Sequence, residues 1–105
     1  MVVLVYELSI SAAENFAGIM QHAGLATVVG RPTPGQLLWG EGVPLSDNFM
    51  AVIPVARIVL PNGEALEGVG VRPDKVVDLK QDDLLRGVDT QLQAAVDYLN
   101  SMSPD

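Results

Sequence analysis

The passage from an apolar strand into a helix near the start of the chain constrains the fold most strongly. Residues 1–5 form a short apolar, β-branched run, which predicts a buried strand. Apolar residues such as Phe16 and Ile19 then recur at helical spacing, and Gly24 stands where a helix is expected to end. Ser11 therefore lies between a strand and a helix, where the free N–H groups of the first helical turn favour nearby negative charge.

Two interpretations of Ser11 follow from this position. A serine hydroxyl held at a sharp strand-to-helix turn is well placed to act as a nucleophile. The spacing Ser11-x-x-Glu14 is also that of a capping box, in which the hydroxyl binds an amide of the first turn and the glutamate reaches back to the cap. The local sequence alone favours the cap, because most motifs of this kind only cap helices.

Composition sets broad limits on the function. The chain has 105 residues, 49% of them hydrophobic, which predicts one globular domain or part of one. Its net charge of −7 argues against non-specific binding to nucleic acid or to anionic membranes, since both require basic surface. No apolar run approaches the length of a membrane span. The chain has no cysteine, which excludes disulfides, a thiol nucleophile and cysteine-based metal sites.

The rest of the chain alternates short strands, turns and helices. The expected elements are a strand at 26–29, hairpins that turn at 46–48 and 61–63, and helices at 81–86 and 90–100. Asn62-Gly63 favours a type I′ turn, Asp89 is the expected N-cap of the last helix, and residues 101–105 are expected to form a frayed tail. This mixture predicts an α/β or α+β fold.

Segments along nearly the whole chain resemble the tail-specific, or C-terminal-processing, serine proteases. Residues 3–14 are similar to the nucleophile motif of this family, in which the second serine of an S-A-S group attacks the substrate. Further matches occur in the family's order at 24–30, 33–36, 44–47, 55–57, 61–63, 68–74 and 87–92. The resemblance implies a crotonase-like fold of stacked ββα units and a serine endopeptidase in which Ser11 forms an acyl-enzyme.

The resemblance also assigns roles to other positions, with one departure. The main branch of the family uses a lysine base from a T-F-G-K loop, but the residue at that position is Gln36, whose amide cannot take a proton. The missing lysine places the chain closer to tricorn protease and the interphotoreceptor retinoid-binding proteins. In tricorn protease a histidine from the earlier part of the domain is the base and a glutamate orients it; Glu67 is similar in place to that glutamate. The alternative for Glu67 is an exposed carboxylate at a strand end. The N–H of Ala12 is implied as one oxyanion donor.

Other polar residues are expected to have structural roles. His22 is the one histidine, and a rise of 1.5 Å per residue places it about 16 Å along the helix from Ser11. It therefore cannot be the base within one subunit, and it suits the negative end of the helix dipole. Lys75 and Lys80 match no motif position and are expected at the surface. Asp82-Asp83 is expected to begin a helix.

For the chain as a whole, the resemblance implies that residues 1–105 are the C-terminal part of a protease domain, with no PDZ module. An apolar start predicts a sheet edge that pairs with another copy, so a homo-oligomer is expected. The expected substrate is a peptide or protein C-terminus, and no cofactor, metal or nucleic acid is expected. The sequence shows no signal-peptide pattern; proteins of the family it resembles are often exported, and the compartment stays open.

Two further hypotheses for the function stay open. The substitution at Gln36 allows a non-catalytic, protease-like module that binds a peptide or an apolar ligand. The chain by itself is alternatively an oligomer without activity.

Overall fold

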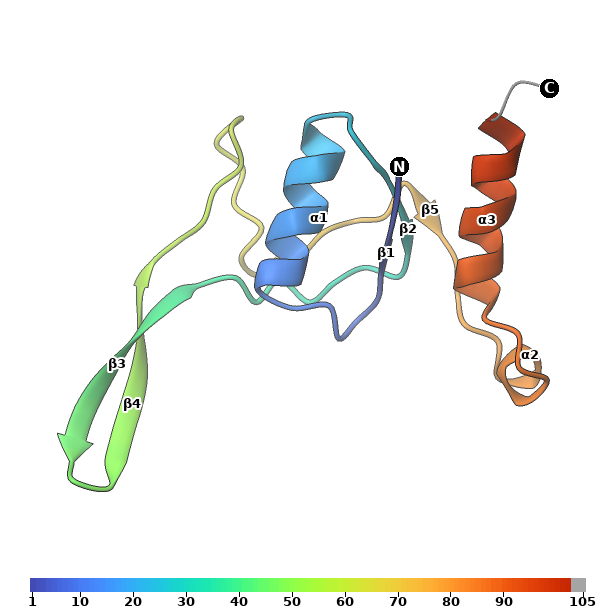
Figure 1. Ribbon diagram of the computed structural model, residues 1–105. Coiled ribbons are helices and arrows are strands. Elements are labelled where there is room, and N and C mark those ends of the chain that lie inside the picture. Colours follow the sequence, from blue (N-terminus) through green and yellow to red (C-terminus); the bar gives the residue numbers. More distant parts are fainter. Residues whose placement is uncertain (103–105) are drawn as a thin grey trace.

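The computed structural model describes residues 1–102 and shows a small α/β body from which one hairpin extends (Figure 1). The elements of the body are β1 (Val2–Val5), α1 (Ala12–His22), β2 (Thr27–Gly30), β5 (Lys75–Val76), α2 (Gln81–Leu85) and α3 (Thr90–Met102). The three strands form a parallel sheet in the order β1-β2-β5. Helices α1 and α3 lie on opposite sides of this sheet. The mixed α/β class expected from the sequence is confirmed.

The central strand of the sheet, β2, is buried on both faces, as is typical of parallel sheets. Val28 and Val29 on the central strand have no exposed surface, and Val5 at the end of β1 is 2% exposed. Val5 and Val28 form the centre of the core with Ala17 of α1 and Val71 of a later loop. The two β-branched runs that predicted buried strands therefore do form the sheet.

The buried face of α1 does not consist of the large apolar residues that recur at helical spacing. Phe16 and Ile19 are 53% and 46% exposed, whereas Glu14, Ala17 and Gly18 are buried. A Cβ added at Gly18 would lie 2.6 Å from a leucine side chain of the neighbouring loop. Helix α1 therefore packs through small residues and one carboxylate, which allow close approach, and not through its large apolar side chains.

The predicted helix ends are largely confirmed. Gly24 has a φ of +67°, and the N–H groups of Gly24 and Leu25 donate back to carbonyls of the last turn of α1. The Asp89 carboxylate accepts the N–H groups of Gln91 and Leu92 at 2.9 and 3.0 Å, as expected of an N-cap.

Two local predictions need correction. Helix α3 continues to Met102, so the first two residues of the expected frayed tail are helical; residues 103–105 lie outside the described residues. The turn at 61–63 is present, with the Gly63 N–H donating to Leu60 O at 2.8 Å. In this turn only Gly63 has a positive φ. A type I′ turn needs a positive φ at both central residues, which here are Pro61 and Asn62. Pro61 fixes its own φ at a negative value and so excludes that turn.

The predicted hairpin at 46–48 is confirmed and projects from the body (Figure 1). It consists of β3 (Trp39–Ser46) and β4 (Phe49–Ala56), which pair antiparallel. Every residue of β3 is exposed, and so is every residue of β4 except Ala51. The radius of gyration is 17.2 Å, whereas a compact domain of this length would have about 13 Å. Within residues 1–102 no helix has the length and apolarity needed to cross a membrane.

Candidate active site

The turn that joins β1 to α1 holds Ser11 in an unusual backbone conformation. Its φ is +55° and its ψ is −114°, and among the described residues no other non-glycine residue has a positive φ. A backbone of this kind costs on the order of 1–3 kcal/mol and persists only where surrounding contacts determine it. Ser11 is exposed and directly precedes the first residue of α1. A strained, exposed serine at a strand-to-helix turn has the geometry of a nucleophile elbow.

The Glu14 carboxylate supplies several of those contacts. It has no exposed surface. Its Oε2 accepts the N–H of Ser11 at 3.0 Å and the N–H of Gln36 at 2.9 Å. Its Oε1 accepts the Thr33 hydroxyl and the Gly35 N–H, both at 2.6 Å. One buried side chain therefore joins the turn that carries the serine to the loop that carries position 36.

Two opposed effects set the pKa of Glu14. Burial raises this pKa because it disfavours the charged form. The hydrogen bonds from Thr33, Gln36, Gly35 and Ser11 stabilise the carboxylate and together outweigh burial, so the pKa lies below its ordinary value of 4.5. The predicted capping box is present, but the capping motif gave no sign of the three bonds from the 33–36 loop to Glu14.

The 33–36 loop is fixed from its other side by residues 66–71. The Gly68 N–H donates to Gly35 O at 2.8 Å, and the Thr33 N–H donates to Val71 O at 3.1 Å. The Val71 N–H in turn donates to the Thr33 hydroxyl at 2.8 Å. Gly70 has a φ of +73°, and a Cβ there would lie 2.0 Å from Thr33 O. The loops meet too closely for any side chain at that position.

The structure brings three of the expected site residues onto these connected loops. The Ser11 N–H donates to Gln36 O at 3.0 Å, so position 36 lies beside the serine, as the resemblance implies. Glu67 Oε2 accepts the N–H of Leu37, the next residue, at 2.6 Å. Glu67 is half-buried and lies in a turn, so the alternative of an exposed carboxylate at a strand end is wrong. Its bond to the loop is a contact that the sequence did not indicate.

Ala12 at the start of α1 lies next to Ser11, whereas His22 at the end of α1 does not. Ala12 is exposed at the first helical position, and within residues 1–102 its N–H has no hydrogen-bond partner. A free N–H next to the serine is what an oxyanion donor needs. His22 lies in the last turn of α1, and the structure does not bring it to Ser11.

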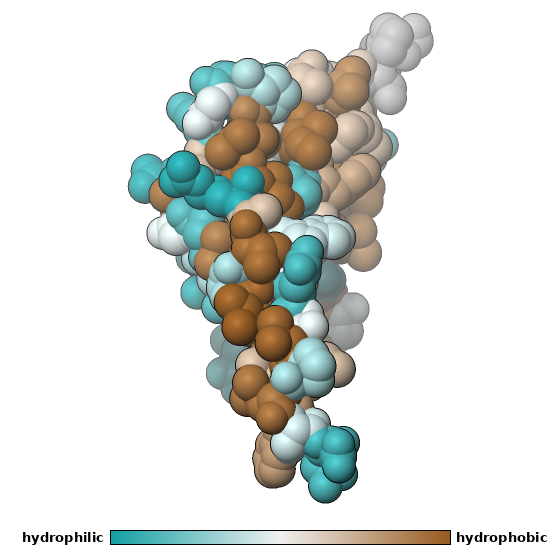
Figure 2. Space-filling model, turned by 90° about the vertical axis from the view of Figure 1, so that its left-hand side faces the viewer, coloured by the Kyte–Doolittle hydropathy of each residue, from teal (hydrophilic) through white to brown (hydrophobic). Residues whose placement is uncertain are grey.

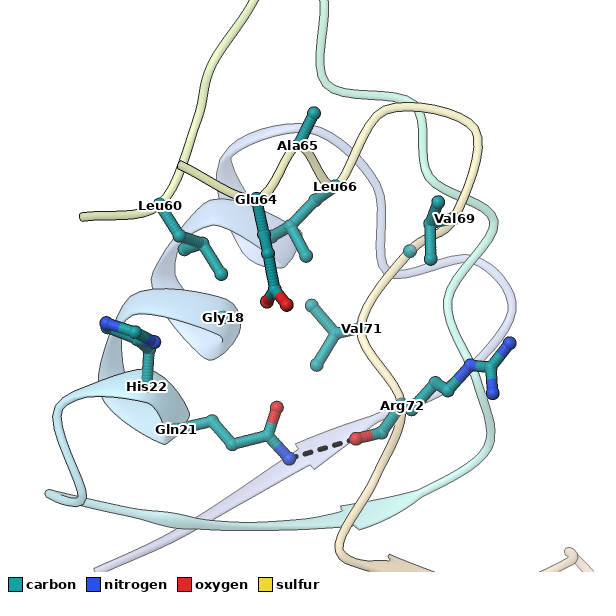
Figure 3. Close-up of a pocket in the computed structure, with 11 residues that line it drawn as sticks. Gly18, Gln21, His22, Leu60, Glu64, Ala65, Leu66, Val69, Val71 and Arg72 are labelled. Atoms are coloured by element: carbon teal, nitrogen blue, oxygen red, sulfur yellow. Dashed lines mark hydrogen bonds between the residues drawn. The ribbon is translucent and has the colours of Figure 1, made fainter. Parts of the chain in front are cut away.

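A separate groove of about 450 Å³ runs beside the C-terminal half of α1 (Figure 3). Leu66 and Val71 line it beside Gly18, and the Glu64 side chain points into it. Ser11 does not line this groove. In the part of the chain that the structure describes, no three histidine, aspartate or glutamate side chains form a group able to hold a metal ion.

Comparison with known proteins agrees with this geometry. The family model of peptidase family S41 matches residues 1–77. The chain belongs to peptidase family S41. It is 34% identical over 102 residues to a carboxyl-terminal-processing protease of Synechocystis sp. (strain ATCC 27184 / PCC 6803 / Kazusa), which covers 94% of this chain and 24% of that protein. The expected membership of the C-terminal-processing proteases is thereby confirmed.

Two solved protease structures share the fold. The tricorn protease aligns with a TM-score of 0.85 and 25% identity over 93% of this chain and 10% of the tricorn chain. The photosystem II D1 C-terminal processing protease aligns with a TM-score of 0.66 and 35% identity over 73% of this chain and 20% of that one. The chain thus spans about a quarter or less of the length of these relatives.

Proposed function

We propose that this S41 chain is the part of a serine-type peptidase domain that carries the nucleophile, Ser11. The observation that carries the proposal is the backbone of Ser11, with a φ of +55° and an N–H that donates both to Glu14 Oε2 and to Gln36 O. An ordinary helix cap has an extended backbone, and the backbone of Ser11 departs from it although a capping box is present. The names of the S41 relatives, which are C-terminal-processing proteases, support the same activity.

In the proposed reaction the Ser11 hydroxyl attacks the carbonyl carbon of a peptide bond near the C-terminus of a substrate. A base takes the hydroxyl proton, and the oxyanion that forms accepts the N–H of Ala12. The proton then passes to the leaving amine, and an ester to Ser11 remains. Attack by water releases the new C-terminus and frees the serine. The substrate is therefore an unfolded protein tail or a peptide.

The base and the second oxyanion donor are proposed to come from outside residues 1–105. The amide of Gln36 cannot act as the base, and His22 lies at the far end of α1. A chain that spans 24% of a relative's length fits the C-terminal part of a catalytic domain. Glu67 uses Oε2 to hold Leu37, which leaves Oε1 able to orient an imidazole, and Gln36 is placed to contact the substrate. Loss of one oxyanion donor costs about 2.7–4 kcal/mol, so the chain alone is expected to be slow.

Fluorophosphonate labelling read by intact mass tests the proposal. We expect slow labelling of one site in the wild-type chain, faster labelling when the chain is expressed within its complete reading frame, and none in Ser11→Ala. Ser9→Ala is the matched control, because Ser9 lies on the same turn and its hydroxyl accepts the Tyr6 N–H. A label that survives Ser11→Ala, or a complete protein that stays unlabelled, would contradict the proposal.

A second candidate is a non-catalytic module that binds a peptide or an apolar ligand, and the groove beside α1 favours it. The groove has an apolar floor and a volume within the range of small-molecule sites. Glu64→Trp would place a large side chain inside it, because the Glu64 side chain points into the groove. Saturable binding of a fluorescent fatty acid that this substitution abolishes, together with an unlabelled Ser11, would favour the binding module over the peptidase.

A further inference from the structure

The segment of residues 33–38 turns every second side chain outward beside Ser11. Its residues alternate between buried and exposed without exception, which is the period of an extended chain. Leu37 is 1% exposed, whereas Leu38 is 43% exposed. Gln36 and Leu38 therefore lie on the same, outward face of the segment, and Figure 1 shows the segment passing the first turn of α1 before it enters β3.

Hydrogen bonds fix this outward face relative to Ser11. The Ser11 N–H donates to Gln36 O at 3.0 Å. The Oε2 atom of the buried Glu14 carboxylate also accepts the N–H groups of Ser11 and Gln36, at 3.0 and 2.9 Å. Ser11 is itself exposed, so a substrate can approach it from solvent. Any substrate that Ser11 attacks therefore lies next to Gln36 and close to the outward face.

The outward face of the segment carries no charge. Its exposed residues are Pro34, Gln36 and Leu38. Ile10, which directly precedes Ser11, is apolar and 47% exposed. Leu38 directly precedes the first residue of β3, and Figure 2 shows apolar surface over much of the hairpin and onto the body. An uncharged and partly apolar surface beside the nucleophile favours apolar substrate side chains over charged ones.

We propose that Leu38 selects an apolar side chain of the substrate, about two residues from the bond that Ser11 attacks. Position 36 and Leu38 are two residues apart, which is about 7 Å in an extended chain, and an extended substrate advances by the same distance in two residues. Contact with Leu38 stabilises an apolar side chain, whereas it removes a charged one from water without a partner. The inference rests on the proposed peptidase function and adds to it a residue that determines specificity.

Peptide cleavage by the chain expressed within its complete reading frame tests this assignment. The peptides carry leucine, glutamate or lysine at one varied position, which is the second or third residue on either side of the cleaved bond. At one of these positions the wild type should prefer leucine to both charged residues by about tenfold or more in kcat/KM. At the same position Leu38→Arg should shift the preference to glutamate, and Leu38→Glu should shift it to lysine.

Leu25→Arg is the matched control for the charge at Leu38. Leu25 is 61% exposed and follows the C-terminal end of α1, far from Ser11, so the preference should stay within about threefold of the wild type. Opposite preferences in the two Leu38 variants cannot arise from misfolding. Fluorophosphonate labelling of Ser11 together with an unchanged preference in both Leu38 variants would overturn this inference and leave the proposed function standing. A complete protein that neither labels nor cleaves would contradict both.

Discussion

The body and the hairpin are stabilised by different means. Around Glu14 the body is held by hydrogen bonds that join the serine turn, the 33–36 loop and the 66–71 segment, and the carboxylate at their centre is completely buried. The hairpin has its cross-strand pairing and almost no buried surface. The contrast teaches that geometry at Ser11 is determined within the chain, whereas the hairpin depends on what packs against it.

The largest expected effect comes from removing the charge at the centre of the body. Glu14→Gln replaces one carboxylate oxygen by an NH₂ group. This group is a donor, so it cannot accept the hydrogen bonds that the facing groups donate. We expect a loss of about 3 kcal/mol or more in the free energy of unfolding, measured by urea titration with circular dichroism. Glu41→Gln, the same change on the exposed hairpin, is the matched control and should shift that free energy by less than about 0.5 kcal/mol. Equal effects would erase the distinction between the two regions.

A pair of glycines measures how tightly the loops of the body meet. Gly70 and Gly68 have nearly the same φ, +73° and +74°, but a Cβ at Gly70 meets Thr33 O at 2.0 Å while one at Gly68 meets nothing within 4 Å. Gly68→Ala should therefore cost only about 1 kcal/mol of backbone strain. Gly70→Ala should cost about 3 kcal/mol or more, because backbone must move. Similar melting temperatures for the two variants would show that the loops have room to separate.

Acid should weaken the body through Glu14. Because the pKa of Glu14 in the folded chain is below 4.5, its contribution to stability is complete above that pH. The contribution is lost as the pH falls from 4.5 through the lowered pKa, since protonation removes an acceptor of these hydrogen bonds. Urea titrations at several pH values should show this loss in the wild type and in Glu41→Gln. In Glu14→Gln the free energy should fall less over the same range, and parallel curves would count against the assignment.

The smallest expected effect lies in the hairpin. At concentrations where the chain is monomeric, Val52→Lys should change the free energy of unfolding of the body by less than about 0.5 kcal/mol, because Val52 is 73% exposed. Hydrogen exchange followed by mass spectrometry would separate the two regions. Slower exchange in the hairpin than in β2 would reverse the comparison.

Sequence patterns predicted those parts of the fold that depend on local chemistry. The β-branched runs gave β1 and β2, Gly24 marked the end of α1, and Asp89 capped α3. The buried face of α1 did not follow from periodicity, because Ala17 and Gly18 occupy it and the large apolar residues do not. A local sequence pattern does not indicate whether another part of the protein packs against an apolar side chain such as Phe16.

The site was predictable only in part, for a related reason. The resemblance placed Ser11 and Gln36 together, and the structure joins their backbones. The loop contacts of Glu14 and Glu67 were not predictable, because each depends on residues 19 to 30 positions away that meet only in the fold. A buried glutamate read as a helix cap gives no sign of the loop that it also holds.

The most direct test of the central claim is to restore a base at position 36. If Glu14 holds Ser11 beside that position, Gln36→Lys should increase the rate of fluorophosphonate labelling at Ser11 by about tenfold or more, and Ser11→Ala in the same background should abolish it. Gln36→Arg, which adds a charge that cannot accept a proton at neutral pH, is the control and should give no such increase. Equal rates for Gln36→Lys and Gln36→Arg would contradict the claim that the structure places position 36 to activate Ser11.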